Sequence, residues 1–312
     1  MSTRRSFLQF SLELSLGALA ATATAVISSH RAQSQARTFK VATRNGTGLF
    51  VRDSGGSGRA VVMTHAWPLN ADIWDYQAMQ LSKAGFRVIT YDRRGFGRSD
   101  KPAGGYDFDT FADDLADVIE QTSVRDATLV GYSMGGGEVV RYFSRHRGRH
   151  VAKAGLVGAA AHYLMKTENN PIGIDGAVFE GIKQGVQGDR KAYLTGLLRD
   201  VFLDARRPSA HPVTQEMVDS TLAMAMQASV AATAACVDAF AKTDFRPELA
   251  AVKVPTLVLH GTSDIPVPFA IGKATADGIA GSKLIEYPDA SHGIVLTERD
   301  RVTRDLQAFI AS

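Results

Sequence analysis

A single serine lies between glycines at residues 131–137, which read GYSMGGG. The apolar run 127–132 predicts a buried strand, and the residues after Ser133 have helical spacing. A sharp turn from strand to helix forces its central residue into strained backbone angles, and glycines two positions before and after it prevent a clash. Such a turn would expose Ser133 Oγ at the carboxyl edge of a sheet, beside a helix N-terminus. The spacing therefore predicts a nucleophilic serine and not a flexible glycine loop.

A serine hydroxyl needs a base to take its proton and a third group to orient that base. When the serine lies on such a turn of an α/β sheet, the chain order is serine, acid, histidine. Of the eight histidines, His292 follows the last predicted strand, in PDASHG, which is where the base belongs. Asp264 follows the penultimate strand, in LHGTSDIPVP, and is the predicted acid. Asp289 is the alternative acid, because it lies three residues before His292.

A tetrahedral intermediate at Ser133 would need two backbone N–H donors. The residue after the nucleophile, Met134, supplies one of them. The loop after the third predicted strand, THAWPLN, supplies the other from Trp67, whose ring we expect to line the acyl pocket.

Eight predicted strands would position these residues. Residues 38–44 and 49–55 alternate apolar and polar side chains, which is typical of half-exposed strands. Six further runs are continuously apolar, which favours strands buried on both faces of a parallel sheet: 60–65, 86–92, 127–132, 154–159, 255–261 and 283–288. Helical patterns separate them, for example 108–122, where Asp109 or Thr110 is the expected N-cap. We therefore predict an α/β fold with a mostly parallel eight-stranded sheet flanked by helices.

Residues 162–235 interrupt this alternation, because they contain no convincing buried strand and end in an Ala/Met-rich helical run. They predict a helical cap inserted after the sixth strand. The core would then consist of residues 37–161 and 236–312.

Residues 1–36 resemble a twin-arginine export signal. Arg4 and Arg5 precede a mildly apolar stretch, and Ser34 and Ala36 offer a small-residue cleavage site after Ala36. The apolar stretch is shorter than the roughly 20 residues that span a bilayer, so we expect an exported protein, periplasmic or secreted, with no stable membrane span after processing.

The composition is that of a folded globular protein, with 45% hydrophobic and 21% charged residues among 312. The formal net charge is +3, most of it in residues 1–36, so nothing predicts an electrostatic footprint for nucleic acid. Cys236 is the only cysteine, which excludes an internal disulfide and CxxC sites. No HExxH or clustered His/Cys motif predicts a metal ion.

From about Thr38 onward the chain resembles the α/β-hydrolase superfamily, and more narrowly the cofactor-free bacterial haloperoxidases, also called perhydrolases or non-haem chloroperoxidases, and their esterase relatives. The resemblance is carried by several long blocks in order: HAWPLNADIWDYQ, VITYDRRGFGRSDKP, YDFDTFADDLADVIE, GYSMGGGEVVRYFSRH, VAKAGLVG, DAFAKTDFRPELAAVKVPTLVLHGTSDIPVP and the SHG around His292. The chain departs from the family pattern where His-Gly-aromatic-Pro becomes His65-Ala66-Trp67-Pro68.

The resemblance implies a catalytic triad of Ser133, Asp264 and His292, with Trp67 and Met134 as oxyanion donors. It implies hydrolysis of small carboxylic esters through an acyl-enzyme, without haem or metal. It also implies that hydrogen peroxide can replace water, so that a carboxylic acid yields a peracid which oxidises halide. A lactonase, or another α/β-hydrolase without perhydrolase activity, is the alternative. The family often associates, so a homo-oligomer is possible.

Overall fold

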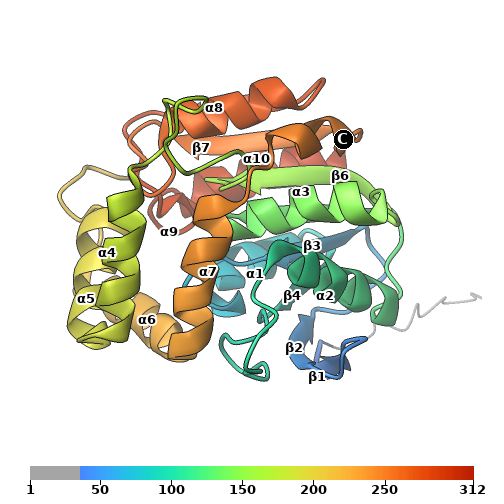
Figure 1. Ribbon diagram of the computed structural model, residues 1–312. Coiled ribbons are helices and arrows are strands. Elements are labelled where there is room, and N and C mark those ends of the chain that lie inside the picture. Colours follow the sequence, from blue (N-terminus) through green and yellow to red (C-terminus); the bar gives the residue numbers. More distant parts are fainter. Residues whose placement is uncertain (1–35) are drawn as a thin grey trace, which may run out of the picture. The chain divides into compact units, whose positions relative to one another are not determined.

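The computed structural model describes residues 36–312 (Figure 1). The predicted export signal therefore lies outside the described residues, apart from Ala36 at its end.

The described chain is built around one eight-stranded sheet in the order β1-β2-β4-β3-β5-β6-β7-β8. The strands are β1 (Arg37–Ala42), β2 (Gly48–Asp53), β3 (Ala60–Thr64), β4 (Arg87–Tyr91), β5 (Ala127–Tyr132), β6 (Val151–Val157), β7 (Thr256–Gly261) and β8 (Lys283–Tyr287). Strand β2 runs antiparallel to both of its neighbours, and all other pairs are parallel. The predicted fold class, α/β with a mostly parallel eight-stranded sheet, is confirmed.

Burial along the strands follows the apolar pattern of the sequence. Strands β3, β5 and β7 are buried at every residue, because helices cover both faces of the sheet. Strand β6 begins at Val151, three residues before its apolar run, because backbone pairing with β5 continues through Lys153.

Helices cover both faces of the sheet (Figure 1). Helix α2 (Phe108–Gln121) packs against α3 (Met134–His146), and α1 (Asp75–Lys83) packs against α10 (Arg299–Ala311). The remaining core helices are η1 (Ala71–Trp74), η3 (Arg246–Ala251), α8 (Phe269–Gly278) and α9 (Ile294–Thr297). The expected N-cap of α2 was wrong: Asp107 is the cap, and its carboxylate accepts a hydrogen bond from the Thr110 N–H at 2.9 Å.

A helical cap connects β6 to β7 and lies at one end of the sheet, on the left of Figure 1. It consists of α4 (Gly176–Gln187), α5 (Arg190–Gly196), the π-helix η2 (Leu197–Phe202), α6 (Gln215–Met226) and α7 (Val230–Lys242). Helix α7 continues past residue 235, the predicted end of the cap, and the buried Val237 and Phe240 extend its apolar face.

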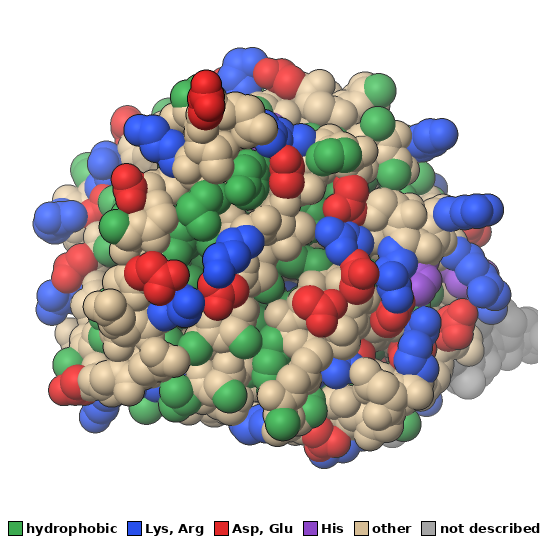
Figure 2. Space-filling model, in the orientation of Figure 1, with side chains coloured by type: hydrophobic (Ala, Val, Ile, Leu, Met, Phe, Trp, Pro, Cys, Tyr) green, Lys and Arg blue, Asp and Glu red, His purple; other side chains and the backbone are tan. Residues whose placement is uncertain are grey.

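No single helix within residues 36–312 is long and apolar enough to cross a bilayer; α6 and α7 meet that test only as a pair, and they are bent by 96° at the break. Charged side chains of both signs are interspersed on the face shown in Figure 2.

Candidate active site

Ser133 lies on the turn between β5 and α3 with φ 55° and ψ −120°, a left-handed conformation that a non-glycine residue adopts only where its surroundings force it. Its backbone N–H donates to the Val157 carbonyl at 2.9 Å. A Cβ on Gly131 would collide with the Gly135 carbonyl, and one on Gly135 would lie 2.9 Å from the Thr64 carbonyl oxygen. The two glycines thus allow the tight turn that the sequence predicted.

The backbone N–H groups of Trp67 and Met134 have no hydrogen-bond acceptor among the described residues. Met134 is the first residue of α3, where the N–H groups of a helix have no intrahelical partner. Trp67 is anchored to the cap by its indole, whose Nε1 donates to the Thr233 carbonyl of α7 at 3.0 Å and whose ring meets the edge of Phe240. Both side chains line the same cavity as Ser133.

His292 and Asp264 form a buried pair. His292 Nδ1 lies 2.6 Å from Asp264 Oδ2, and the other carboxylate oxygen accepts the Val267 N–H at 2.8 Å. This arrangement places the proton on Nδ1 and leaves Nε2 as the basic nitrogen. Asp289, the alternative acid, makes no hydrogen bond to His292 in the described structure, and its backbone N–H donates to Thr262 Oγ1 at 2.8 Å.

Hydrogen bonds and a ring contact connect the loop that carries His292 to both the core and the cap. The Tyr132 hydroxyl of β5 donates to the His292 carbonyl at 2.7 Å, and the Phe202 ring meets the imidazole edge-on at 5.1 Å between ring centres. On either side of His292, Ser291 Oγ donates to the Leu203 carbonyl and the Gly293 N–H donates to the Phe202 carbonyl, both at 2.8 Å. The end of the π-helix therefore helps to hold the imidazole in place, a contact for which the sequence carries no signal.

Two further residues at this site were not predicted as part of it. His260 Nε2 lies 2.8 Å from the Val267 carbonyl and 3.4 Å from Asp264 Oδ2, and burial lowers the pKa of its imidazole. Gly158, at the end of β6, has φ 48°, and a Cβ there would lie 3.3 Å from both Asp264 Oδ2 and His292 Nδ1. A bulkier residue would press on the His292–Asp264 pair.

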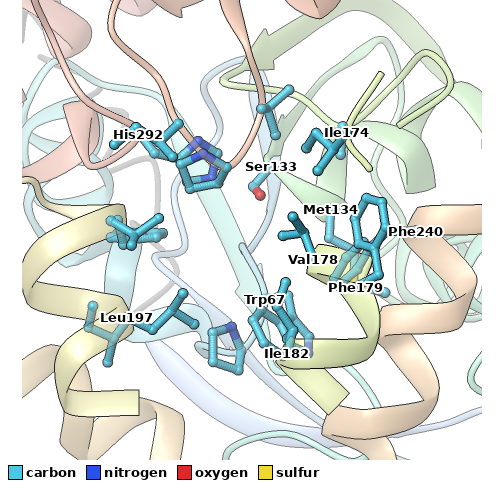
Figure 3. A pocket seen from close by; sticks show the side chains of 18 of the residues that line it. Trp67, Ser133, Met134, Ile174, Val178, Phe179, Ile182, Leu197, Phe240 and His292 are labelled. Carbon is cyan, nitrogen blue, oxygen red and sulfur yellow. The ribbon is translucent and has the colours of Figure 1, made fainter. Parts of the chain in front are cut away.

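Ser133 and His292 both line a cavity of about 790 Å³. Figure 3 shows the Ser133 hydroxyl pointing into the space that the His292 ring borders. The described contacts include no hydrogen bond between Ser133 Oγ and His292, and such bonds are often long in unliganded enzymes. Apart from Ser133, His292 and Tyr193, the wall is formed by apolar side chains and glycines, and no described Asp, Glu, Lys or Arg lines it.

No group of three or more His, Cys, Asp or Glu side chains within residues 36–312 is arranged to hold a metal ion.

The family model described as the alpha/beta hydrolase fold matches residues 59–299. The chain belongs to the α/β-hydrolase family. The sheet, the strained serine turn and the position of the cap after β6 agree with that assignment.

Within the family, this enzyme is close to the non-haem chloroperoxidases and perhydrolases. It is 41% identical to a non-heme chloroperoxidase of Kitasatospora aureofaciens over 86% of this chain and 98% of the relative. It is 39% identical to a bifunctional esterase/perhydrolase of Acinetobacter calcoaceticus over 87% and 99% of the two chains. The solved structure of a bromoperoxidase from Bacillus anthracis matches with a TM-score of 0.83 and 38% identity, covering 89% of this chain and 100% of the other.

Proposed function

We propose that this enzyme is a serine hydrolase of small-molecule carboxylic esters that can also use hydrogen peroxide as the acyl acceptor. The observation that carries the proposal is one apolar cavity lined by Ser133 on a strained turn and by His292 in a hydrogen bond with Asp264. Each of the three residues has the role that its chemistry allows: nucleophile, base and orienting acid.

In the acylation step, Ser133 Oγ attacks the ester carbonyl carbon while its proton passes to His292 Nε2. Asp264 keeps the proton on Nδ1 and stabilises the imidazolium that forms. The oxyanion accepts hydrogen bonds from the Trp67 and Met134 N–H groups, which have no acceptor among the described residues. The C–O bond to the alcohol then breaks, and His292 returns the proton to the leaving oxygen. When the acyl donor is a carboxylic acid, the C–OH bond breaks in the same step and water leaves.

In the deacylation step, His292 removes a proton from water or from hydrogen peroxide, which attacks the acyl carbon. Water yields the carboxylic acid and peroxide yields the peracid, and in both cases Ser133 regains its proton. The peracid transfers one oxygen atom to a halide ion in solution, giving hypohalous acid and the carboxylate. The printed names of the relatives, a chloroperoxidase and an esterase/perhydrolase, support this second use of the acyl-enzyme.

The test is to assay the chain from Arg37 onward for p-nitrophenyl acetate hydrolysis and, in parallel, for bromination of a dione by acetate, peroxide and bromide. Both activities should be present, and both should vanish in Ser133→Ala because both pass through the same acyl-enzyme. Bromination that survives in Ser133→Ala would contradict the shared site. Hydrolysis without bromination would instead favour an esterase or lactonase without perhydrolase activity.

We also propose that the protein is exported through the twin-arginine route and cleaved after Ala36. The pair Arg4-Arg5 and the small residues Ser34 and Ala36 support this proposal. The double variant Arg4→Lys, Arg5→Lys should leave the precursor in the cytoplasm, whereas the exported wild-type protein should begin at Arg37 by N-terminal sequencing. Export of the double variant at the wild-type level would contradict the proposed route.

A further inference from the structure

We infer that the acyl group accepted by this site is an uncharged apolar chain longer than acetyl, in the range of hexanoyl to decanoyl. This inference rests on the proposed function, because it assigns the acyl side of the same cavity.

The geometry of the site divides the cavity into two sides. A carbonyl oxygen held by the Trp67 and Met134 N–H groups, with its carbon at Ser133 Oγ, must turn its leaving oxygen toward His292. The alcohol therefore lies on the His292 side, and the acyl chain extends away from His292. Figure 3 shows Val178, Phe179, Ile182 and Phe240 on the side of Met134 and Trp67, across Ser133 from His292.

The acyl side is bounded by aromatic rings that pack on one another. Phe240 of α7 contacts the Trp67 ring at 5.6 Å and the Phe179 ring of α4 at 6.2 Å between ring centres. Val178 and Ile182 of α4 complete this side with aliphatic surface. We call these five residues the acyl wall.

The cavity as a whole exceeds what an acetyl group can fill. The whole cavity measures about 790 Å³, in the range of sites that enclose ligands of drug size. An acetyl group would leave most of the wall in contact with water. Each added methylene covers apolar surface and should raise kcat/KM by about fourfold until the space is full.

The lining also excludes charge on the acyl chain. No described side chain of the cavity could pair with a carboxylate at the far end of the acyl group, and an unpaired buried charge is strongly unfavourable. The entrance is apolar as well, because Val178 and Ile265 line the cavity while 50% and 45% of their surfaces remain exposed. An apolar acyl chain would therefore contact apolar side chains from the entrance to the interior of the cavity.

The test measures kcat/KM for p-nitrophenyl acetate, butyrate, hexanoate, octanoate and decanoate below their aggregation limits, with Ser133→Ala as the blank. We expect kcat/KM to rise by at least about tenfold from acetate to the optimum. We also expect the suberate half-ester, which carries a carboxylate on a chain of the same length, to react at least about a hundredfold more slowly than the octanoate.

Two glycines of the cavity provide matched variants. Gly181 lies on α4 beside Ile182 of the acyl wall, and Gly196 ends α5 beside Leu197; a Cβ at either position would have no heavy atom within 4 Å. Gly181→Leu should shift the optimum toward butyrate or acetate, because it fills the acyl side. Gly196→Leu should keep the acyl optimum, since Leu197 lies away from the acyl wall (Figure 3). Ala177→Leu, an exposed position on α4 outside the cavity, controls for effects on the helix.

The outcomes separate this inference from the proposed function. Ser133-dependent hydrolysis that is fastest with acetate and declines with chain length would leave the function standing and overturn the inference. An unchanged chain-length profile in Gly181→Leu, or comparable rates for octanoate and the suberate half-ester, would also overturn it. If no ester were hydrolysed in a Ser133-dependent manner, the proposed function and the inference would fail together.

Discussion

Single residues at this site are held in conformations that only their neighbours can maintain. Ser133 has a positive φ because the strand-to-helix turn demands it, and Gly158 has a positive φ directly beside the His292–Asp264 pair. Positive φ is costly for a serine, whereas a glycine adopts it readily and also leaves room for the pair. Ser133 therefore carries backbone strain at the position of the proposed chemistry.

Gly158→Ala should reduce both kcat and stability. The new methyl would lie 3.3 Å from Asp264 Oδ2 and His292 Nδ1, and small misplacements of a catalytic group lower rates strongly. We expect kcat for an activated ester to fall at least about tenfold, while the positive φ costs about 1–2 kcal/mol of unfolding free energy. Gly281→Ala, at a glycine with φ 72° and open space around it, is the matched control. Equal kcat in the two variants would show that Gly158 does not constrain the pair.

The buried His65 should make the free energy of unfolding depend on pH. Burial, assisted by the Arg93 charge, lowers the pKa of its imidazole from 6.5 to about 3. The folded protein therefore keeps His65 neutral while the unfolded chain takes up a proton below about pH 6.5, so acidification favours unfolding. Between about pH 6 and pH 4 this residue should lower the unfolding free energy by about 1.4 kcal/mol per pH unit.

Urea unfolding across that pH range measures the slope for His65. His65→Asn should remove about 1.4 kcal/mol per pH unit from it. His260, whose pKa burial also lowers, contributes in the same direction and remains in the variant. A slope unchanged by His65→Asn would mean that His65 is not held neutral in the folded protein.

At the scale of elements, both the cap and the core contribute residues to the site. Ser133 lies between strand β5 and helix α3, and the loops after β7 and β8 carry Asp264 and His292. Phe202, at the end of the π-helix η2, packs edge-on against the imidazole. π-Helical turns are rare and occur often at functional sites. Two hydrogen bonds at the end of η2 reach the residues on either side of His292.

Ser291→Ala tests this link between cap and core. The substitution removes the donor to the Leu203 carbonyl, and a buried group that loses its partner costs about 1–3 kcal/mol. We expect that loss of unfolding free energy in urea, together with a lower kcat because the His292 loop becomes less constrained. Ser220→Ala, whose exposed hydroxyl bonds only within α6, should change neither quantity. A wild-type kcat in Ser291→Ala would mean that the hydrogen bond from Ser291 to Leu203 does not position His292.

At the scale of the whole molecule, one hydrophobic core extends from the sheet into the cap. Cys236, on α7, is fully buried in this core, and burial raises the pKa of its thiol to about 12. The thiolate is the reactive form of cysteine, so the folded protein should not expose a reactive thiol.

Thiol labelling should therefore report on unfolding of the cap. We expect no reaction of Cys236 with Ellman's reagent in the native protein and one thiol per chain in denaturing urea. Rapid labelling without denaturant would mean that α7 opens readily from the core, which its buried packing does not predict.

The predictable part of this protein is local in the chain. The sheet follows from two alternating and six continuously apolar runs, and the turn at Ser133 follows from glycines two positions away, because immediate neighbours decide whether a tight turn is possible. The expected acid and base, Asp264 and His292, follow from their places after the last two strands, and the structure brings them into contact. The catalytic roles of Asp264 and His292 stay predictions, which Asp264→Asn and His292→Gln would test.

The sequence predicted the ends of helices and strands less accurately than it predicted the elements themselves. Asp107 caps α2 where Asp109 or Thr110 was expected, because several acidic and hydroxyl residues near the start of the helix could each serve as a cap. Strand β6 extends beyond its apolar run, since pairing with β5 does not require apolar side chains.

The sequence alone determined the fold class, the strand-to-helix turn at Ser133 and the chain order of the three expected catalytic residues. Tertiary structure alone decided that Gly158 and His260 lie against Asp264, that the end of η2 holds the His292 loop, and that the cap encloses an uncharged cavity of about 790 Å³. The reason is sequence separation: Ser291 and Leu203 are 88 residues apart, and the pattern around either one contains nothing about the other. Strain in a turn is determined by adjacent residues, whereas the shape of a cavity depends on how distant elements pack together.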